Sequence, residues 1–153
     1  MKRNQIYKLV LTALLAALTY VMTRVVQVPT VGGYTNLGDS MCLLAGLVLG
    51  PWYGFAAAGV GSALVDLLSG YAHYVPGTFV IKGLVALIEL PSEAIMVLGY
   101  FGYKALILGK GLAAASSIPN NLVQAAVGII LSVLLYTALS RVPEIHKAFW
   151  KGE

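Results

Sequence analysis

Apolar residues fill this chain in long continuous runs, and short clusters of turn-forming residues interrupt them. The interruptions fall at 29–33, 50–51, 69–77, 91, 109–111 and 119, where proline, glycine and serine collect. They leave six apolar segments, at 6–26, 37–49, 52–68, 78–90, 92–108 and 120–139. Because the runs are continuous and do not alternate between polar and apolar residues, they predict helices and not the strands of a barrel.

The composition places these helices in a lipid bilayer. Of 153 residues, 59% are hydrophobic and 10% are charged, and the mean hydropathy is +0.84; soluble domains carry about 25% charged residues. A spanning helix needs about 20 apolar residues, so the chain has room for about five or six spans. The prediction is therefore one all-α integral membrane domain over 1–153, a bundle of six transmembrane helices. The segments 37–49 and 78–90 are short for a full span and need protein neighbours.

Basic residues are distributed unequally between the two sides of the predicted bundle. With six spans both termini share a side, and the positive-inside rule places that side in the cytoplasm. The count is six against three: Lys2, Arg3, Lys8, Arg141, Lys147 and Lys151 on the terminal side, and Arg24, Lys104 and Lys110 on the other. The loops 28–38, 69–77 and 109–119 are then outside. A net charge of +4 without grouped basic residues excludes a nucleic-acid partner.

Few residues are suited to catalysis or to metal binding. Cys42 is the single cysteine, lies in an apolar run and is interpreted as a core thiol. His73 is the one histidine on the outer side, which does not support a transition-metal site. The hydrolase, metalloprotease and nucleotide-binding motifs are absent. We therefore expect no cofactor, no metal and no enzymatic activity, and any ATP hydrolysis would come from another chain.

Two charges lie inside the predicted spans at similar depth. Asp66 is one turn from the outer end of its segment, and Lys82 is about one turn into the next. Ionisable groups at such depth face a partner or a cavity, so the two side chains either form a structural ion pair or belong to a ligand site. Asp39 also has two interpretations, as the N-cap of the second helix or as a member of that site.

Polar and aromatic residues gather at the outer end of the segments. Asn121 and Gln124 are three apart and share a helix face. Aromatic faces beside amide and hydroxyl groups suit a flat, polar heterocycle, although tyrosines at this depth are also typical of an interfacial aromatic belt. The predicted substrate-binding residues are Asn36, Asp39, Asp66, Tyr71, Tyr74, Thr78, Lys82, Asn121 and Gln124.

Small residues mark faces where helices can approach closely. The third segment carries Gly54, Ala58, Gly61 and Ser62, which favours packing inside the bundle. Ala13 and Ala17 form an A-x-x-x-A pattern in the first segment. This second pattern fits internal packing and docking to another membrane protein equally well.

Several strings together resemble the substrate-binding S components of energy-coupling factor (ECF) vitamin transporters. They are Asn36-Leu37-Gly38-Asp39, Gly50-Pro51, Gly59-x-Gly61-Ser62-Ala63-Leu64-x-Asp66-Leu67-Leu68-x-Gly70-Tyr71, Pro76-x-Thr78-x-x-x-Lys82-Gly83 and Pro119-Asn120-Asn121-Leu122-Val123-Gln124. The branch that they resemble includes hydroxymethylpyrimidine, pyridoxine and riboflavin type proteins.

The resemblance implies a six-helix bundle in a bacterial plasma membrane. Such a protein captures a vitamin or vitamin precursor from outside and docks onto a transmembrane coupling subunit driven by two cytoplasmic ATPases. It also implies that Ala13 and Ala17 contact the coupling subunit and that the loop 28–38 caps a pocket in the outer half. Pyridoxine, hydroxymethylpyrimidine and riboflavin are the substrates implied.

Two other classes compete with this interpretation. A non-transport scaffold or assembly subunit would have no ligand and would not need Asp66 and Lys82 together. A membrane-embedded transferase would need a phosphate or metal site on the cytoplasmic side, where few residues are available: Glu89, Glu93, Glu144 and His146.

Overall fold

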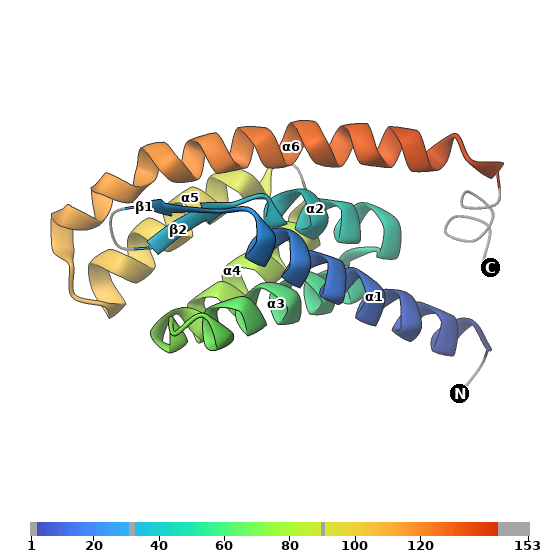
Figure 1. Cartoon of the computed structure of the whole chain (residues 1–153), viewed down its shortest axis with the longest axis horizontal. Coiled ribbons are helices and arrows are strands. Elements are labelled where there is room, and N and C mark those ends of the chain that lie inside the picture. Colours follow the sequence, from blue (N-terminus) through green and yellow to red (C-terminus); the bar gives the residue numbers. More distant parts are fainter. Residues whose placement is uncertain (1–2, 31–32, 90, 144–153) are drawn as a thin grey trace.

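The computed structural model describes residues 3–30, 33–89 and 91–143, and six α-helices account for most of them (Figure 1). The helices are α1 (Arg3–Val25), α2 (Gly38–Leu49), α3 (Pro51–Leu68), α4 (Val75–Ile88), α5 (Ser92–Gly102) and α6 (Ile118–Ser140). Short 3-10 turns, η1 (Ala72–Tyr74) and η3 (Gly111–Ser117), precede α4 and α6. The predicted all-α fold class is confirmed.

The structure differs from the predicted segments at two places. A short antiparallel hairpin, β1 (Gln27–Thr30) and β2 (Gly33–Asn36), occupies most of the expected loop 28–38, with Gln27 opposite Asn36. The segment 92–108 is not one regular helix, because α5 ends at Gly102 and a π-helical turn, η2 (Tyr103–Ile107), follows it. In that turn the Leu108 N–H donates to the carbonyl of Tyr103, five residues back, at 3.0 Å.

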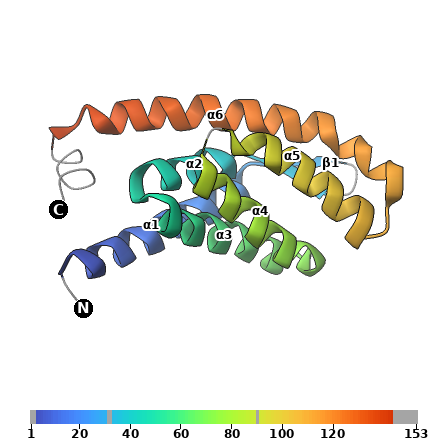
Figure 2. The same ribbon diagram turned by 180° about the vertical axis from the view of Figure 1, so that it is seen from behind.

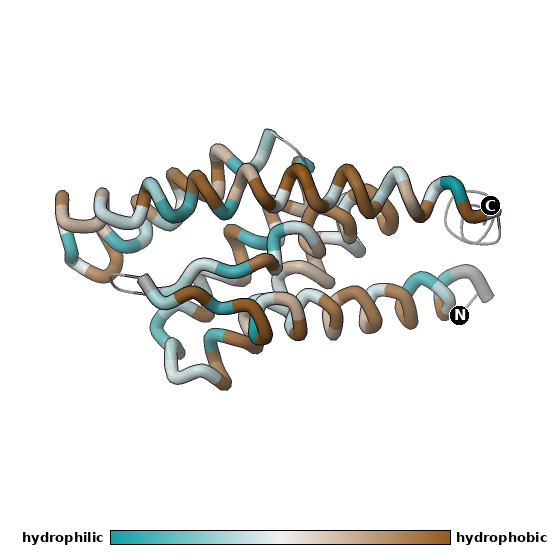
Figure 3. Tube along the Cα trace, turned by 45° about the horizontal axis from the view of Figure 1, so that its top comes forward, coloured by the Kyte–Doolittle hydropathy of each residue, from teal (hydrophilic) through white to brown (hydrophobic). Residues whose placement is uncertain are grey.

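Helix length separates two helices from the rest of the described chain. Gln5–Val25 and Gly111–Ser140 are long and apolar enough to cross a membrane, whereas Gly38–Leu49 and Ala72–Ile88 are apolar but shorter. Apolar residues cover α1 and α6 along their length in Figure 3, and polar residues gather near the hairpin and near the chain ends. The long helices therefore present the surfaces best suited to lipid.

The short helix α2 lies at the centre of the bundle. It contacts α1, α3, α4 and α6, and every one of its residues except Leu47 is buried. Seen from behind, α4 and α5 complete the bundle between α3 and α6 (Figure 2). The hairpin and the start of α6 lie at the end of the bundle away from both termini (Figure 1).

Glycines allow α3 to pack closely against its neighbours. A Cβ added at Gly54 would lie 2.7 Å from the Cα of Gly46, and one at Gly61 would lie 2.5 Å from the carbonyl oxygen of Ala16. Backbone at these distances cannot shift cheaply, so the small residues of α3 pack against α2 and α1. Ala13 and Ala17 are exposed, on the part of α1 that does not pack on α3.

Candidate functional site

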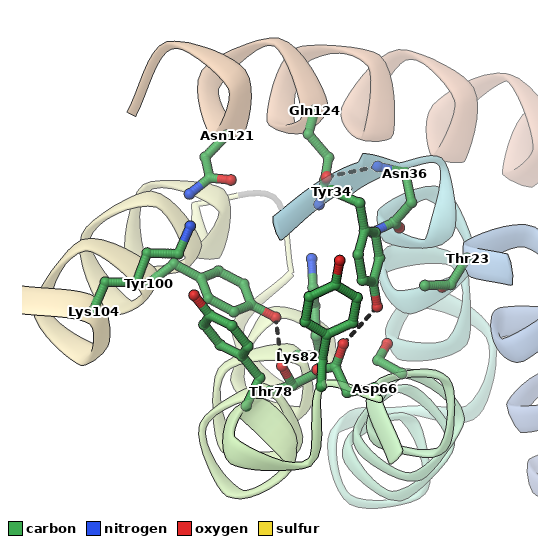
Figure 4. Close-up of a pocket in the computed structure, with 13 residues that line it drawn as sticks. Thr23, Tyr34, Asn36, Asp66, Thr78, Lys82, Tyr100, Lys104, Asn121 and Gln124 are labelled. Carbon is green, nitrogen blue, oxygen red and sulfur yellow. Dashed lines mark hydrogen bonds between the residues drawn. The ribbon is translucent and has the colours of Figure 1, made fainter. Parts of the chain in front are cut away.

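A cavity opens at the hairpin end of the bundle (Figure 4). Eight of the nine predicted site residues line it: Asn36, Asp66, Tyr71, Tyr74, Thr78, Lys82, Asn121 and Gln124. The structure thus brings together residues from β2, α3, η1, α4 and α6, and their role in binding stays a prediction.

Asp39, the ninth residue, lies behind the cavity wall with no exposed surface. Its carboxylate forms an ion pair with the Lys82 ammonium group and accepts a hydrogen bond from Gln124 Nε2 at 2.5 Å. Of the two alternatives left open for Asp66 and Lys82, the structural ion pair between them is therefore wrong. Depth alone suggested it, whereas the contact between α2 and α4 brings Asp39 to Lys82.

The N-cap interpretation of Asp39 is also wrong. Helix α2 begins at Gly38, and its capping residue Leu37 makes no side-chain cap. Instead the Gly38 N–H donates to Asn36 Oδ1 at 2.8 Å. The Asp39 carboxylate is thus directed to Lys82 and Gln124.

Gln124 joins three elements through one amide. Its Oε1 accepts a hydrogen bond from the Asn36 backbone N–H at 2.8 Å, and its Nε2 donates to Asp39. The hairpin, α2 and α6 are consequently held together beside the cavity. Because all of these groups are buried, each needs its partner to compensate for the loss of water.

The buried Asp66 carboxylate is hydrogen-bonded to hydroxyl groups of neighbouring residues. Tyr34 Oη donates to Asp66 Oδ1 at 2.5 Å, and the Thr78 hydroxyl is also hydrogen-bonded to this carboxylate. The Thr78 hydroxyl also lies 3.0 Å from the Tyr100 hydroxyl, and either of these two groups can donate to the other. Burial, and then the Asp66 charge, raise the pKa of Tyr34. Tyr34 therefore stays protonated and remains a donor.

Aromatic rings surround the mouth of the cavity. The Tyr34 and Tyr71 ring centres are 5.5 Å apart, and those of Tyr71 and Tyr74 are 6.3 Å apart. The rings are tilted relative to one another, as aromatic pairs prefer. His73 packs on Tyr74 with ring centres 4.6 Å apart, but does not line the cavity.

The nine predicted site residues omit five that line the cavity: Thr23, Tyr34, Ser62, Tyr100 and Lys104. The sequence pattern places Lys104 only among the outer basic residues, although its spacing of four from Tyr100 indicates a shared helix face. Thr23 is 3% exposed, and its Oγ1 has no hydrogen-bond partner in the described part of the chain. Nothing in the apolar run of α1 distinguishes Thr23 from a packing residue.

Comparison with known proteins identifies the family. Residues 3–89 match the family described as ECF-type riboflavin transporter, S component. The thiamine precursor transporter HmpT of Lactococcus lactis subsp. cremoris is 31% identical over 154 residues, which cover 92% of each chain. The chain belongs to the S components of ECF-type transporters. An uncharacterized protein of Pyrococcus woesei is also similar to this S component, at 34% identity over 123 residues, covering 69% of this chain and 82% of that protein.

Membership of this family establishes the general function of the chain. An S component is the substrate-binding part of a membrane transporter, so this chain is a plasma membrane protein that binds a substrate and works with transporter partners. The predicted family and general function are confirmed. The scaffold and transferase alternatives lose their support, since the chain is a transport subunit.

Proposed function

We propose that this S component binds a pyridine or pyrimidine type vitamin, or vitamin precursor, in the cavity beside the hairpin. The observation that carries the proposal is the combination of tyrosine rings with buried directional groups around one cavity. Rings favour a flat ligand, and a few fixed polar groups orient it. The relative HmpT is named as a thiamine precursor transporter and is similar over nearly its whole length.

Riboflavin is the second candidate, because the matching family is described as a riboflavin transporter S component. That match ends at residue 89. The part of the chain beyond it supplies Tyr100, Lys104, Asn121 and Gln124 to the cavity. The family match therefore does not cover these four lining residues, whereas the similarity to HmpT covers 92% of this chain, and this favours the single-ring class.

The ligand class is tested on the full chain purified in detergent. We expect mass spectrometry of the small molecules released from it to find a pyridine or pyrimidine derivative. We also expect calorimetric titration to show at least tenfold tighter binding of pyridoxine or hydroxymethylpyrimidine than of riboflavin. Tighter binding of riboflavin would select the second candidate, and failure of all three to bind would contradict the proposed class.

We propose further that all six helices cross the membrane, with both termini in the cytoplasm and the hairpin outside. Burial of α2 by protein on every side supports this, because a helix shielded from lipid need not match the bilayer thickness. The positive-inside count also supports it. Lys2, Lys147 and Lys151 from that count, like Glu144 and His146, lie outside the described residues.

Cysteine labelling tests this orientation. In a Cys42→Ala background, Val28→Cys and Leu112→Cys are expected to react with a membrane-impermeant maleimide in intact cells, because both positions are exposed near the hairpin end. Lys8→Cys, near the chain ends, is the control and should react only after permeabilisation. The reverse pattern would invert the proposed topology.

We propose that delivery of the substrate uses a transmembrane coupling subunit and two cytoplasmic ATPases, and that α1 docks onto the coupling subunit through Ala13 and Ala17. The exposure of both alanines supports this, since internal packing does not use them. Large apolar side chains are exposed beside them, including Val10, Leu14 and Val21. Small residues among larger ones let a partner helix approach closely in lipid.

A further inference from the structure

Lys104 carries a buried positive charge that the protein does not pair. It lies in the turn η2, lines the cavity and is 8% exposed. Among the described residues, its ammonium group makes neither an ion pair nor a hydrogen bond, and its nearest charge-stabilising neighbour is the Tyr74 ring, 5.8 Å away. Burying a charge without a partner is costly. A cavity-facing lysine of this kind indicates that the bound molecule supplies the missing acceptor.

Asn121 provides a second donor on the same side. It is 8% exposed, and its Nδ2 has no hydrogen-bond partner in the described part of the chain. Figure 4 shows the side chains of Asn121 and Lys104 together on one side of the cavity, with Tyr34 and Asp66 on the other. Two donors without acceptors, one of them charged, therefore converge from α6 and η2.

The unpaired charges that line the cavity make one wall positive and the other negative. Lys82 and Asp39 neutralise each other as an ion pair. Among the residues that line the cavity, the charges left are Lys104 on one wall and Asp66 on the other, and the ion pairs of the described residues do not join them. A ligand between these walls lies in a field that runs from the Lys104 ammonium group to the Asp66 carboxylate.

We propose that the substrate is a dipolar heterocycle that places an anionic oxygen against Lys104 and Asn121 and an N–H donor toward Asp66. This inference rests on the proposed function and narrows it. A hydroxypyridine in its zwitterionic form has both groups, a phenolate oxygen and a pyridinium N–H, on one flat ring. An aminopyrimidine carries the donor but no anionic oxygen, so the unpaired charge of Lys104 favours the hydroxypyridine class.

The experiment removes the charge on the protein and the oxygen on the ligand separately. Wild type, Lys104→Met and Lys110→Met are titrated calorimetrically with pyridoxine and with its analogue lacking the ring hydroxyl. Lys110 is the matched control, because it is a lysine six residues away whose side chain is exposed. Wild type and Lys110→Met are expected to bind pyridoxine about tenfold to hundredfold more tightly than the analogue, the range of a charged hydrogen bond. Lys104→Met should lose most of this preference, because only the Asn121 amide then remains to donate to the ring oxygen.

Several results would overturn the inference. Unchanged pyridoxine affinity in Lys104→Met would remove Lys104 from the site, and an equal loss of both ligands would make its role structural. If Lys104→Met does not fold, Lys104→Gln replaces it and is expected to lose the same discrimination in part. Binding of hydroxymethylpyrimidine but not pyridoxine by wild type would overturn the inference and leave the proposed function standing. Failure of pyridoxine, hydroxymethylpyrimidine and riboflavin to bind would overturn both.

Discussion

Replacing Lys82 by methionine is expected to destabilise the folded protein by about 3 to 5 kcal/mol, because it leaves the Asp39 carboxylate buried without its cation. Asp39 has no exposed surface, so water cannot replace the lost partner. Among the described residues, Gln124 would remain as the side-chain donor to the carboxylate. The measurement is denaturant unfolding of the full chain in detergent, followed by circular dichroism. We expect the midpoint of unfolding to fall sharply.

Two double variants identify the partner of Lys82. In Asp39→Asn with Lys82→Met neither charge remains, and the new amide still offers an oxygen to Gln124, so most of the lost stability should return. In Asp66→Asn with Lys82→Met the Asp39 charge stays unpaired, and no recovery is expected. Recovery in the second variant and not in the first would restore the pairing of Asp66 with Lys82 and contradict the structure.

The helices could be predicted from the sequence because a bilayer imposes a simple rule on a chain that enters it. Backbone groups in lipid must be satisfied within the segment, so a long apolar run bounded by turn residues becomes a helix. The predicted segment 120–139 corresponds to α6 (Ile118–Ser140), and 52–68 to α3 (Pro51–Leu68). The hairpin gave no such signal, because each strand has four residues.

The gathering of polar residues around one cavity could also be predicted, since depth along each helix follows from residue count. The sequence could not show which charged residues form an ion pair. The pairing depends on the position and rotation of α2 between its neighbours, and the local sequence pattern does not determine either. Asp66 and Lys82 share a depth, but Asp39 reaches Lys82 from the central helix.

Lys104 shows a second limit of the sequence pattern. A lysine near the end of an apolar run is ordinarily a loop charge that reaches the interface. Lys104 lies four residues after Tyr100, in the π-helical turn that follows α5, and both side chains line the cavity. The spacing indicates that the two residues share a face but not that this face lines a cavity, so the sequence places Lys104 only among the outer basic residues.

A bulky residue on the open face of α1 is expected to abolish transport without affecting substrate binding. In Ala13→Trp and Ala17→Trp the indole would hold a partner helix away from α1, and close approach is what small residues permit. The cavity lies at the other end of the bundle, where Thr23 is the one residue of α1 among its lining residues. Uptake of labelled substrate by cells that contain the coupling module should fall to background. Calorimetric affinity of the purified variants should stay within about twofold of wild type, a difference of about 0.4 kcal/mol.

Two further alanines separate docking from internal packing. Ala126 is an exposed alanine on α6, and Ala126→Trp should leave uptake intact, because α6 is not the proposed docking helix. Ala16 faces α3, where its carbonyl lies against Gly61, so Ala16→Trp should impair folding itself. Normal uptake in Ala13→Trp and Ala17→Trp would place the docking surface elsewhere. If these two variants lost substrate binding as Ala16→Trp does, the alanines would be packing residues, because only a face open to a partner can accept a tryptophan and keep the cavity unchanged.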